Sequence, residues 1–332
     1  MTTTPPWLLR QLQDLRRQQG HALLLSGPAG MGQYELAMAL AQAWLCEQPT
    51  EQGACGACAS CHAIEVKTHP DLKMLLPETL CLEWGWPIDP KTQEKIDKKE
   101  VKPSKWIRVD AAREAVAFTQ LTQSRGRGQV VLIYPAERLN VESANTLLKT
   151  LEEPTGQTRF IVATEAAHQL LPTIRSRCLT HTMQWPQEAE AQAWLAQHTQ
   201  ASAADIACAL KATGGLPSEA LEWLQNGFVA AAWAALPKSL WTQQPGPLAD
   251  WPIARQMDAL QKLCHDLLCL ANQAEPRYFD PAHLPTRLPS LPALVSWQKN
   301  LQKAAQTMEH PYMPALLQEA WVLRAAKALH NH

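Results

Sequence analysis

The interpretation of this chain depends on the stretch Gly27-Pro28-Ala29-Gly30-Met31-Gly32-Gln33-Tyr34. The stretch follows the apolar run 22–25 and has the spacing of a phosphate-binding loop, G-x-x-x-x-G-K-[ST]. In an intact loop the glycines let backbone N–H groups surround the phosphates, the lysine reaches the β- and γ-phosphates, and the hydroxyl holds Mg²⁺. Gln33 and Tyr34 replace the lysine and the hydroxyl residue, so the loop lacks the two side chains on which its chemistry depends.

The two replacements weaken any interaction with a nucleotide. An amide can donate a hydrogen bond to a phosphate but carries no charge, and a charge-assisted bond contributes about 1.5–3 kcal/mol against about 1 kcal/mol for a neutral one. A phenol on a rigid ring is a poor substitute for a compact hydroxyl at a metal ion. We therefore expect no productive ATP binding by this loop, whose former cofactor-binding positions are Gly27, Gly30, Gly32, Gln33 and Tyr34.

The segments around the loop have the order strand, loop and helix. Residues 22–25 form the apolar strand, and after Tyr34 apolar side chains recur at helical spacing as far as Leu45. The loop thus leads into a helix N-terminus, as an anion-binding site requires. A further amphipathic helix is expected at 7–17.

Length and composition limit the class of protein. A chain of 332 residues exceeds an ordinary domain, so two or three domains are expected, and 46% hydrophobic residues supply a substantial core. No apolar run approaches the ~20 residues of a membrane span, and the N-terminus lacks the pattern of an export signal, so we expect a cytoplasmic protein without a membrane partner. The formal net charge of −1 gives no overall attraction to nucleic acid. Contact with DNA would be local or made through partners.

Four cysteines follow the predicted helix in the spacing C-x8-C-x2-C-x2-C: Cys46, Cys55, Cys58 and Cys61. Four thiolates within a short loop are the ligand set of a closed tetrahedral zinc site. A redox C-x-x-C pair and four unrelated cysteines are the alternatives, and the adjacent His62 ranks below the cysteines as a ligand. No hydrolytic acid or base stands nearby in the sequence, so the pattern predicts structural Zn²⁺ in a module at 46–61.

Strand and helix patterns alternate through the first 183 residues. Strands are expected at 22–25, 72–76, 129–134, 159–164 and 179–183, and helices at 34–45, 111–121 and 141–151, the last with Asn140 as its N-cap. This alternation predicts an α/β fold, a P-loop type of parallel sheet with helices on both faces. The glycine loop would lie at the carboxyl ends of the strands.

The strand at 129–134 lacks the second part of an ATPase site. In P-loop ATPases this strand ends in an acidic pair that holds Mg²⁺ and positions water, whereas this chain has Tyr134 and Pro135. Glu137 lies two residues farther on, and we do not take it as a catalytic base. Because two independent parts of the catalytic apparatus are missing, the sequence favours a retired nucleotide site.

Residues 78–108 interrupt the alternation with an irregular segment that contains Trp84 and Trp86. The segment also carries lysines interleaved with acidic residues: Lys91, Lys95, Lys98, Lys99, Lys102 and Lys105 with Glu94, Asp97 and Glu100. A DNA-facing basic patch is one interpretation. A solvated, flexible insertion is favoured because the two signs of charge are interleaved.

The composition shifts to Ala, Gln and Leu after residue 185, and the sheet pattern ends. Helices are expected at 188–198, 203–213 and 218–224 and, beyond a linker rich in proline and tryptophan at 237–252, at 257–271, 291–308 and 314–329. We expect three domains: a nucleotide-fold domain at 1–183, a small helical lid at 184–236 and an all-α domain at 237–332.

Two further motifs connect the chain to a family. Residues 145–154 read N-T-L-L-K-T-L-E-E-P, and residues 171–178 read L-P-T-I-R-S-R-C. Together with the cysteine cluster after the glycine loop, they resemble the bacterial clamp-loader ATPases of the AAA+ class, across 22–183 and thinly beyond. The resemblance implies that 237–332 is a collar that joins the subunits of a pentamer. The lid carries Leu216-Pro217-Ser218 where active relatives have an arginine that senses nucleotide.

The resemblance also implies a role for Arg177 in the triplet Ser176-Arg177-Cys178. In the family this arginine is a finger that reaches the ATP bound on a neighbouring subunit, and Arg175 is expected to be a packing or surface residue. The chain would be a stator without ATPase activity of its own, a component of the DNA polymerase III holoenzyme. Its partners would be the tau/gamma ATPase subunits and the delta subunit, and the complex would load the sliding clamp onto primed DNA.

Two other functions stay open on the sequence. A variant P-loop ATPase or helicase-like motor would keep nucleotide binding through Gln33 and use Glu137 to activate water. A zinc-centred DNA-binding module is the weaker alternative, because the cysteine loop is small, lacks a basic helix and is a single unit. A titration of the isolated chain with ATP distinguishes the motor from the stator.

Overall fold

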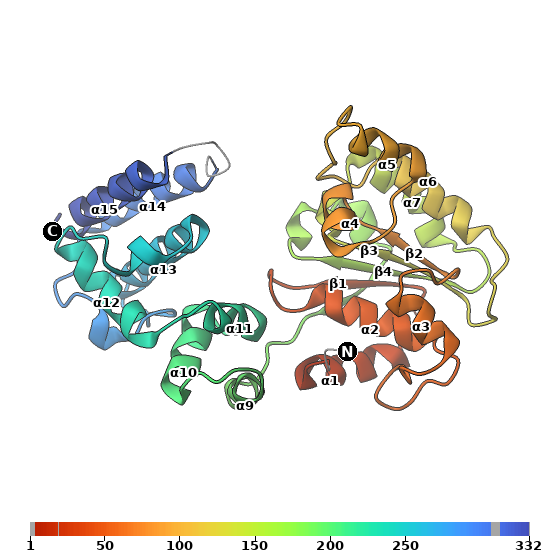
Figure 1. The fold of residues 1–332 in the computed structure, drawn as a ribbon, viewed down its shortest axis with the longest axis horizontal. Coiled ribbons are helices and arrows are strands. Elements are labelled where there is room, and N and C mark those ends of the chain that lie inside the picture. The colour runs from red at the N-terminus through yellow and green to blue at the C-terminus, as the bar shows by residue number, and fades with distance from the viewer. Residues whose placement is uncertain (1–3, 19, 307–312, 332) are drawn as a thin grey trace. The chain divides into compact units, whose positions relative to one another are not determined.

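The computed structural model describes residues 4–18, 20–306 and 313–331. The chain divides into two compact units, Met1–Pro186 and Gln187–His332 (Figure 1). The separation of the second unit into a lid at 184–236 and a collar at 237–332 stays a prediction. None of the helices in the described part of the chain combines the length and the apolar character that crossing a bilayer requires.

The first unit is built on a five-stranded parallel sheet. Its strands are β1 (Ala22–Ser26), β2 (Leu72–Leu75), β3 (Gln129–Ile133), β4 (Thr158–Thr164) and β5 (Leu179–Thr182), in the order β2-β3-β4-β1-β5. In the register of the central strand, Leu24 lies between Val162 of β4 and Thr180 of β5. All five expected strands and the predicted α/β class are therefore confirmed.

Helices cover both faces of this sheet. They are α1 (Pro6–Arg17), α2 (Gln33–Leu45), α3 (Ala59–Glu65), α6 (Val109–Thr119), α7 (Val141–Glu152) and the one-turn α8 (Pro172–Arg175). Alternate strand residues, Leu24, Val131 and Phe160 among them, pack in one buried cluster with side chains of α6 and α7. Figure 1 shows α1 and α2 on the opposite side of the sheet. Asn140 accepts a 2.7 Å hydrogen bond from the backbone N–H of Ser143, so the predicted N-cap of α7 is confirmed.

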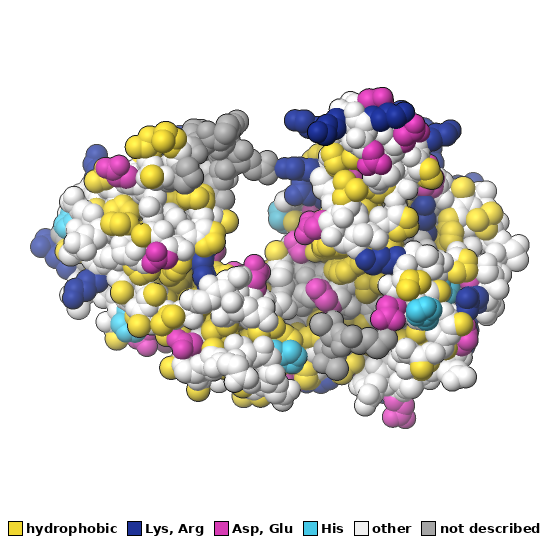
Figure 2. Space-filling model, in the orientation of Figure 1, with side chains coloured by type: hydrophobic (Ala, Val, Ile, Leu, Met, Phe, Trp, Pro, Cys, Tyr) yellow, Lys and Arg dark blue, Asp and Glu magenta, His cyan; other side chains and the backbone are white. Residues whose placement is uncertain are grey.

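The segment 78–108, expected to be irregular, contains two helices, so that expectation was wrong. They are α4 (Glu78–Trp84) and α5 (Pro90–Asp97). Gly85 ends α4 in the left-handed region at φ 66°, and Asp89 caps α5 by accepting a 3.0 Å hydrogen bond from the N–H of Thr92. The Asp-Pro pair at 89–90 was the sequence signal for the second helix. No residue of α5 is buried, and Figure 2 shows both signs of charge around it.

The second unit is entirely helical among its described residues. Its helices are α9 (Glu188–His198), α10 (Ala203–Ala212), α11 (Pro217–Gln225), α12 (Ala230–Trp241), α13 (Ile253–Ala271), α14 (Leu291–Gln306) and α15 (Pro314–Leu329). These bounds confirm the six expected helices, except that positions 307–308 lie outside the described residues. Short 3-10 turns lie at Ala136–Arg138 and Ala167–Gln169 in the first unit and at Gly246–Asp250 and Pro281–His283 in the second.

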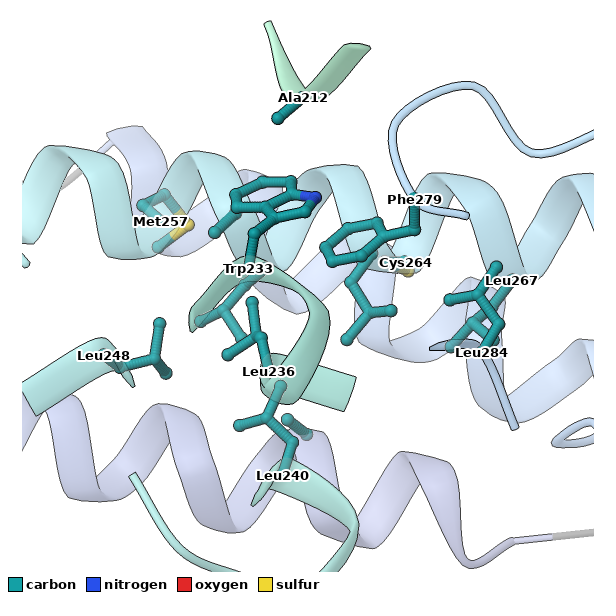
Figure 3. Close-up of a cluster of buried hydrophobic side chains, with 14 of the residues drawn as sticks. Ala212, Trp233, Leu236, Leu240, Leu248, Met257, Cys264, Leu267, Phe279 and Leu284 are labelled. Carbon is teal, nitrogen blue, oxygen red and sulfur yellow. The ribbon is translucent and has the colours of Figure 1, made fainter. Parts of the chain in front are cut away.

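The prediction of a linker at 237–252 was wrong for its first five residues, because α12 continues through Pro237 to Trp241. Proline inside a helix removes one hydrogen bond and costs about 3 kcal/mol. Burial of the apolar face of α12 outweighs that cost, since Trp233, Leu236 and Leu240 are each at most 2% exposed. Figure 3 shows Trp233 beside Phe279, and the two rings stack with centroids 4.5 Å apart.

Candidate functional site

The side chain of Gln33 is turned into the glycine loop itself. Gln33 is 2% exposed, and its Nε2 donates hydrogen bonds to the carbonyl oxygens of Gly27 at 2.9 Å and Pro28 at 2.6 Å. An amide NH₂ has two hydrogens to donate, and both are used here. Gln33 therefore holds the loop closed on itself and has no donor left for a phosphate.

The loop glycines keep the geometry that such a loop needs. Gly30 and Gly32 have φ angles of 82° and 89°, a region that L side chains rarely adopt. A Cβ at Gly32 would lie 2.9 Å from Cδ1 of Leu8, and a Cβ at Gly27 would lie 2.8 Å from Cβ of Met183. Neighbouring side chains thus pack directly on the loop, and the glycines serve this packing without any nucleotide.

Tyr34 stands where an intact loop presents its metal-binding hydroxyl, and it belongs to an aromatic cluster. Its hydroxyl accepts a 2.9 Å hydrogen bond from the indole Nε1 of Trp86. Its ring lies 4.5 Å from that of Trp84 and 5.4 Å from that of Tyr134, measured between centroids. Burial raises the pKa of Tyr34, so the phenol stays protonated at neutral pH. The hydroxyl position is committed to an indole and not to a metal ion.

The end of β3 also has its polar groups paired within the protein. The hydroxyl of Tyr134 donates to Oε1 of Glu165 at 2.7 Å, and burial raises the pKa of Tyr134 well above its usual range. Glu137 accepts a 2.6 Å hydrogen bond from the hydroxyl of Thr164 at the end of β4, and a weaker one from the backbone N–H of Glu165. This carboxylate ties β4 to the turn after β3.

Arg177 lies between α8 and β5, within reach of solvent. Its side chain is 28% exposed; Nε donates to Oε2 of Glu152 at 3.1 Å, and Nη1 donates to the carbonyl oxygen of Thr173 at 3.0 Å. Glu152 belongs to the L-E-E-P motif, so the two family motifs meet through this ion pair. A planar guanidinium that is permanently charged can pair with phosphate oxygens in two directions at once.

Arg177 and the glycine loop lie at opposite ends of the parallel strands. The loop follows the carboxyl end of β1, whereas Arg177 comes just before the amino end of β5, which pairs parallel with β1. A four-residue strand at ~3.3 Å per residue separates those two ends by about 13 Å. Arg177 therefore lies at the end of the strands away from the chain's own loop.

The four predicted metal-ligating cysteines come together in space. The Sγ atoms of Cys46, Cys55, Cys58 and Cys61 all lie within 4.8 Å of one another. Individual Sγ–Sγ distances are 3.7 Å for Cys46–Cys61, 3.8 Å for Cys46–Cys58 and 4.0 Å for Cys55–Cys61. Tetrahedral zinc with bonds of about 2.3 Å places sulfurs ~3.8 Å apart, so the cluster fits Zn²⁺.

The surroundings of the cluster suit thiolate ligands. The backbone N–H of Cys55 donates to Sγ of Cys46 at 3.2 Å, and that of Cys61 donates to Sγ of Cys58 at 3.4 Å. His62 is outside the cluster: its side chain is 75% exposed and lies 3.9 Å from Glu65. The ranking of His62 below the cysteines thus agrees with the structure.

One neighbour connects the cysteine module to the rest of the first unit. Glu47 accepts hydrogen bonds from the hydroxyl of Ser60 at 3.0 Å and from Nη1 of Arg125 at 2.8 Å. Arg125 in turn donates its backbone N–H to the buried Asp71. The module therefore fastens the end of α2 to the segment before β3.

Trp84 and Trp86 are the site residues whose role the sequence did not predict. Both lie in the inserted segment, some 50 positions from Tyr34, and only the structure brings them to the glycine loop. The W-G-W triplet at 84–86 was a signal, because glycine between two large aromatic residues permits a sharp turn. Nothing in its spacing indicated which surface the rings would meet.

A parallel sheet with a glycine loop between its first strand and the next helix defines the P-loop class of nucleotide-binding folds. The sequence model of the family described as "DNA polymerase III, delta subunit" matches residues 7–187, more than half of the chain. The degenerate loop and the absent acidic pair predicted the delta-prime subunit of the clamp loader rather than tau/gamma. The chain belongs to the DNA polymerase III delta-prime family, so this prediction is confirmed.

The relatives cover different shares of the chain. DNA polymerase III subunit delta' of Pseudomonas aeruginosa is 39% identical over 194 residues, which are 58% of this chain and 52% of that protein. The Escherichia coli subunit delta' is 31% identical over 277 residues, 77% of this chain and 76% of that protein. The Salmonella typhimurium subunit tau is 32% identical over 159 residues, 48% of this chain and 21% of that protein. The chain thus spans about half the length of the Pseudomonas relative.

Solved structures give more distant likenesses. A DNA polymerase III gamma subunit-related protein from Thermotoga maritima has a TM-score of 0.46 at 15% identity, covering 98% of this chain and 100% of that one. The Bacillus subtilis DNA clamp loader delta protein has a TM-score of 0.36 at 12% identity, covering 96% of this chain and 98% of that one.

Proposed function

We propose that this chain is a stator subunit of a DNA polymerase III clamp loader that lends Arg177 to ATP hydrolysis in a neighbouring tau/gamma subunit. The observation that carries the proposal is the position of Arg177 at the end of the strands opposite the chain's own closed loop. An arginine there is out of reach of the chain's own loop and is available to an active site that another subunit brings to it. Opening of the sliding clamp and its placement on primed DNA would be the work of the whole complex.

The chemistry of Arg177 suits a finger supplied in trans. A guanidinium stabilises the negative charge that develops on the γ-phosphate during transfer, and such fingers typically raise the rate about 10³–10⁵-fold. The ion pair with Glu152 and the hydrogen bond to the Thr173 carbonyl must open first. Arg177 is 28% and Glu152 58% exposed, and a surface pair contributes about 0–1 kcal/mol and a neutral hydrogen bond about 1 kcal/mol. The free energy of this release is small beside the rate effect of a finger.

The chain's own loop is proposed to be inactive. Gln33 is hydrogen-bonded to loop carbonyls, Tyr34 is hydrogen-bonded to Trp86, and the end of β3 presents Tyr134 instead of a carboxylate. These contacts oppose the rival function of a variant ATPase or helicase-like motor, which needs Gln33 free for phosphate and Glu137 free for water. Glu137 instead accepts the hydroxyl hydrogen of Thr164.

Zn²⁺ held by the four cysteines is proposed to be structural. Four sulfur ligands leave no open coordination position for a substrate or water, which is the mark of a structural site. Cys46, Cys55, Cys58 and Cys61 would bind the ion, and the ion would supply folding free energy to the module. The contacts of Glu47 with Ser60 and Arg125 would pass that rigidity to the sheet.

Association with tau/gamma and delta subunits in a hetero-pentamer is supported by exposed apolar side chains on the last two helices. Leu316 and Leu323, seven positions apart on α15, are 60% and 52% exposed, and Leu291 on α14 is 47% exposed. Residues seven apart lie on the same face of a helix. An exposed apolar face of this kind is typical of a surface that a partner covers.

Two measurements test this function. The chain, co-expressed with tau/gamma and delta subunits, should purify with them in one complex of fixed stoichiometry, and failure to associate would contradict the stator role. Titration of the isolated chain with Mg²⁺·ATP should show neither turnover nor affinity in the micromolar range. Micromolar binding with turnover would favour the motor instead.

A further inference from the structure

The inserted segment 78–108 has two halves with different surroundings. Leu76, Cys81 and Trp86 form a small buried cluster, against which Met38 of α2 and Tyr134 after β3 also pack. The half from α4 to Trp86 is thus packed against the sheet and α2. The half that contains α5 has no buried residue.

We infer that the packed half of the insertion is a steric plug for the degenerate nucleotide site, with the ring of Trp84 filling the place of the Mg²⁺-bound phosphates. The inference rests on the proposed loss of nucleotide binding and is independent of the role of Arg177. It assigns a function to a segment that the family resemblance left without one.

The geometry of three rings defines the plug. Tyr34 stands at the hydroxyl position of the loop and Tyr134 at the strand end where an acidic pair would hold Mg²⁺, and the centroids of these two rings are 5.4 Å apart. The Trp84 ring packs against both, at 4.5 Å from Tyr34 and at 6.0 Å, stacked, from Tyr134. A metal ion between those two positions would meet aromatic carbon instead of oxygen ligands.

Specific contacts hold Trp84 in this position. The left-handed Gly85 turns the chain, so that Trp86 lies 7% exposed with its Nε1 hydrogen-bonded to the hydroxyl of Tyr34. Lys67 donates its ammonium group to the carbonyl oxygen of Trp84 and lies 5.7 Å from the ring centroid of Trp86. The segment is thus held from two sides, by Tyr34 at the start of α2 and by Lys67, two residues after the end of α3.

The plug changes what restoration of the loop would require. Replacing Gln33 by lysine and Tyr34 by threonine restores the residue types that bind phosphate and Mg²⁺. With Trp84 still packed on Tyr134, a triphosphate would have to displace a partly buried aromatic ring before it could bind. Restored ligands alone are then insufficient.

The test compares the full-length variants Gln33→Lys/Tyr34→Thr and Gln33→Lys/Tyr34→Thr/Trp84→Ala. We expect the variant that also lacks Trp84 to bind the fluorescent analogue mant-ATP with Mg²⁺ at least ten-fold more tightly. A matched control adds Trp106→Ala to the restored pair, because Trp106 lies in the same segment but is 50% exposed and contacts Arg138. This control should bind as the restored pair does.

Equal binding by the restored pair with and without Trp84, whether tight or absent in both, would overturn the inference. Circular dichroism and zinc content establish that each variant is folded, and Trp84→Leu replaces Trp84→Ala if the alanine variant unfolds. The single variant Trp84→Ala in a reconstituted loader should support clamp- and DNA-stimulated ATPase activity as the wild type does. Loss of that activity would contradict a role confined to the plug. Because this variant keeps Arg177, its result does not depend on the proposed role of Arg177.

Discussion

Gln33 illustrates, at the scale of single residues, how the glycine loop has its polar groups paired within the protein. A lysine at this position would leave its charge directed at an empty loop, whereas the amide satisfies two loop carbonyls that point inward. Tyr34 likewise exchanges a metal ligand for an aromatic contact and a hydrogen bond to Trp86. Both replacements favour the closed loop in the absence of any nucleotide.

The residue types in the sequence showed which side chains of a phosphate-binding loop are absent, but not where the side chains that replace them lie. Lysine and hydroxyl were recognisably absent at 33 and 34, and the cysteine spacing predicted a cluster that the structure brings together. The contacts of Trp84 and Trp86 with Tyr34 join positions about 50 residues apart. Such long-range side-chain contacts depend on the finished fold and have no local signature.

Removal of one zinc ligand tests the metal site. We expect about one zinc per chain in the wild type, none in Cys55→Ser, and a loss of unfolding free energy of at least about 2 kcal/mol, because the module then loses its cross-link. For a unit of this size that loss lowers Tm by roughly 4–8 °C. Elemental analysis and thermal melting measure both quantities. Cys269→Ser, on helix α13 outside the cluster, should keep its zinc, and a zinc-free wild type would refute the site.

Asp205 predicts a dependence of stability on pH. Its carboxylate accepts the backbone N–H of Ala230 at 2.8 Å and lies 2.6 Å from the hydroxyl of Ser202, and these contacts lower its pKa. A lowered folded-state pKa means that the stabilisation is complete above the unfolded value, about 3.9, and is lost as pH falls through the folded value. The stability advantage of wild type over Asp205→Asn, from urea unfolding, should therefore stay level above about pH 5 and shrink as the pH falls below about 4. A constant difference would exclude this linkage.

Strands and helices differ in how well the sequence predicted them. The buried strand β3 (Q-V-V-L-I) is a continuous apolar run of the kind that pattern alone identifies, whereas β2 (L-K-M-L) and β5 (L-T-H-T) are shorter and less buried. Helix α12 was missed because Pro237 marks a break, yet burial of Trp233 and Leu236 carries the helix past it. Helices α4 and α5 were missed because short polar helices have little apolar periodicity.

The cap of α7 gives a prediction at the scale of an element. This helix carries Glu152, the partner of Arg177, and begins at the Asn140 cap. Asn140→Ala should lower the free energy of unfolding by about 1 kcal/mol, since the N–H of Ser143 loses its acceptor. Urea unfolding, followed through the transition of the first unit, measures the change. Asn300→Ala, at an exposed position inside α14, should have no destabilising effect, and equal losses in both variants would contradict the cap.

The whole molecule combines a sheet unit that keeps a nucleotide fold with a helical unit that presents apolar residues. Core contacts alone do not explain exposed leucines such as Leu316 and Leu323, which we assign to subunit association. The alternation of strand and helix predicted the first unit well. Its place in an assembly came from family motifs, since no property of a single chain specifies the number of its partners.

Charge introduced on α15 tests the assembly surface. Leu316→Asp/Leu323→Asp should leave the isolated chain folded, because both side chains are already exposed, and should abolish co-purification with tau/gamma and delta subunits. Leu121→Asp changes a residue of the first unit that is 65% exposed and should leave the complex intact. Size-exclusion chromatography with circular dichroism checks both expectations. An intact complex with the α15 double variant would contradict the role of Leu316 and Leu323 in subunit association.

The most direct test of the central claim replaces Arg177 with alanine in a reconstituted loader, with Arg175→Ala as the matched control. Both arginines flank Ser176, and only Arg177 is assigned to the neighbouring active site. With Arg177→Ala, hydrolysis at the adjoining tau/gamma site should slow by about 10³-fold or more. The clamp- and DNA-stimulated ATPase rate then falls by that site's share, while complex formation and the Arg175→Ala rate stay at wild-type levels. An unchanged stimulated rate with Arg177→Ala would contradict the account.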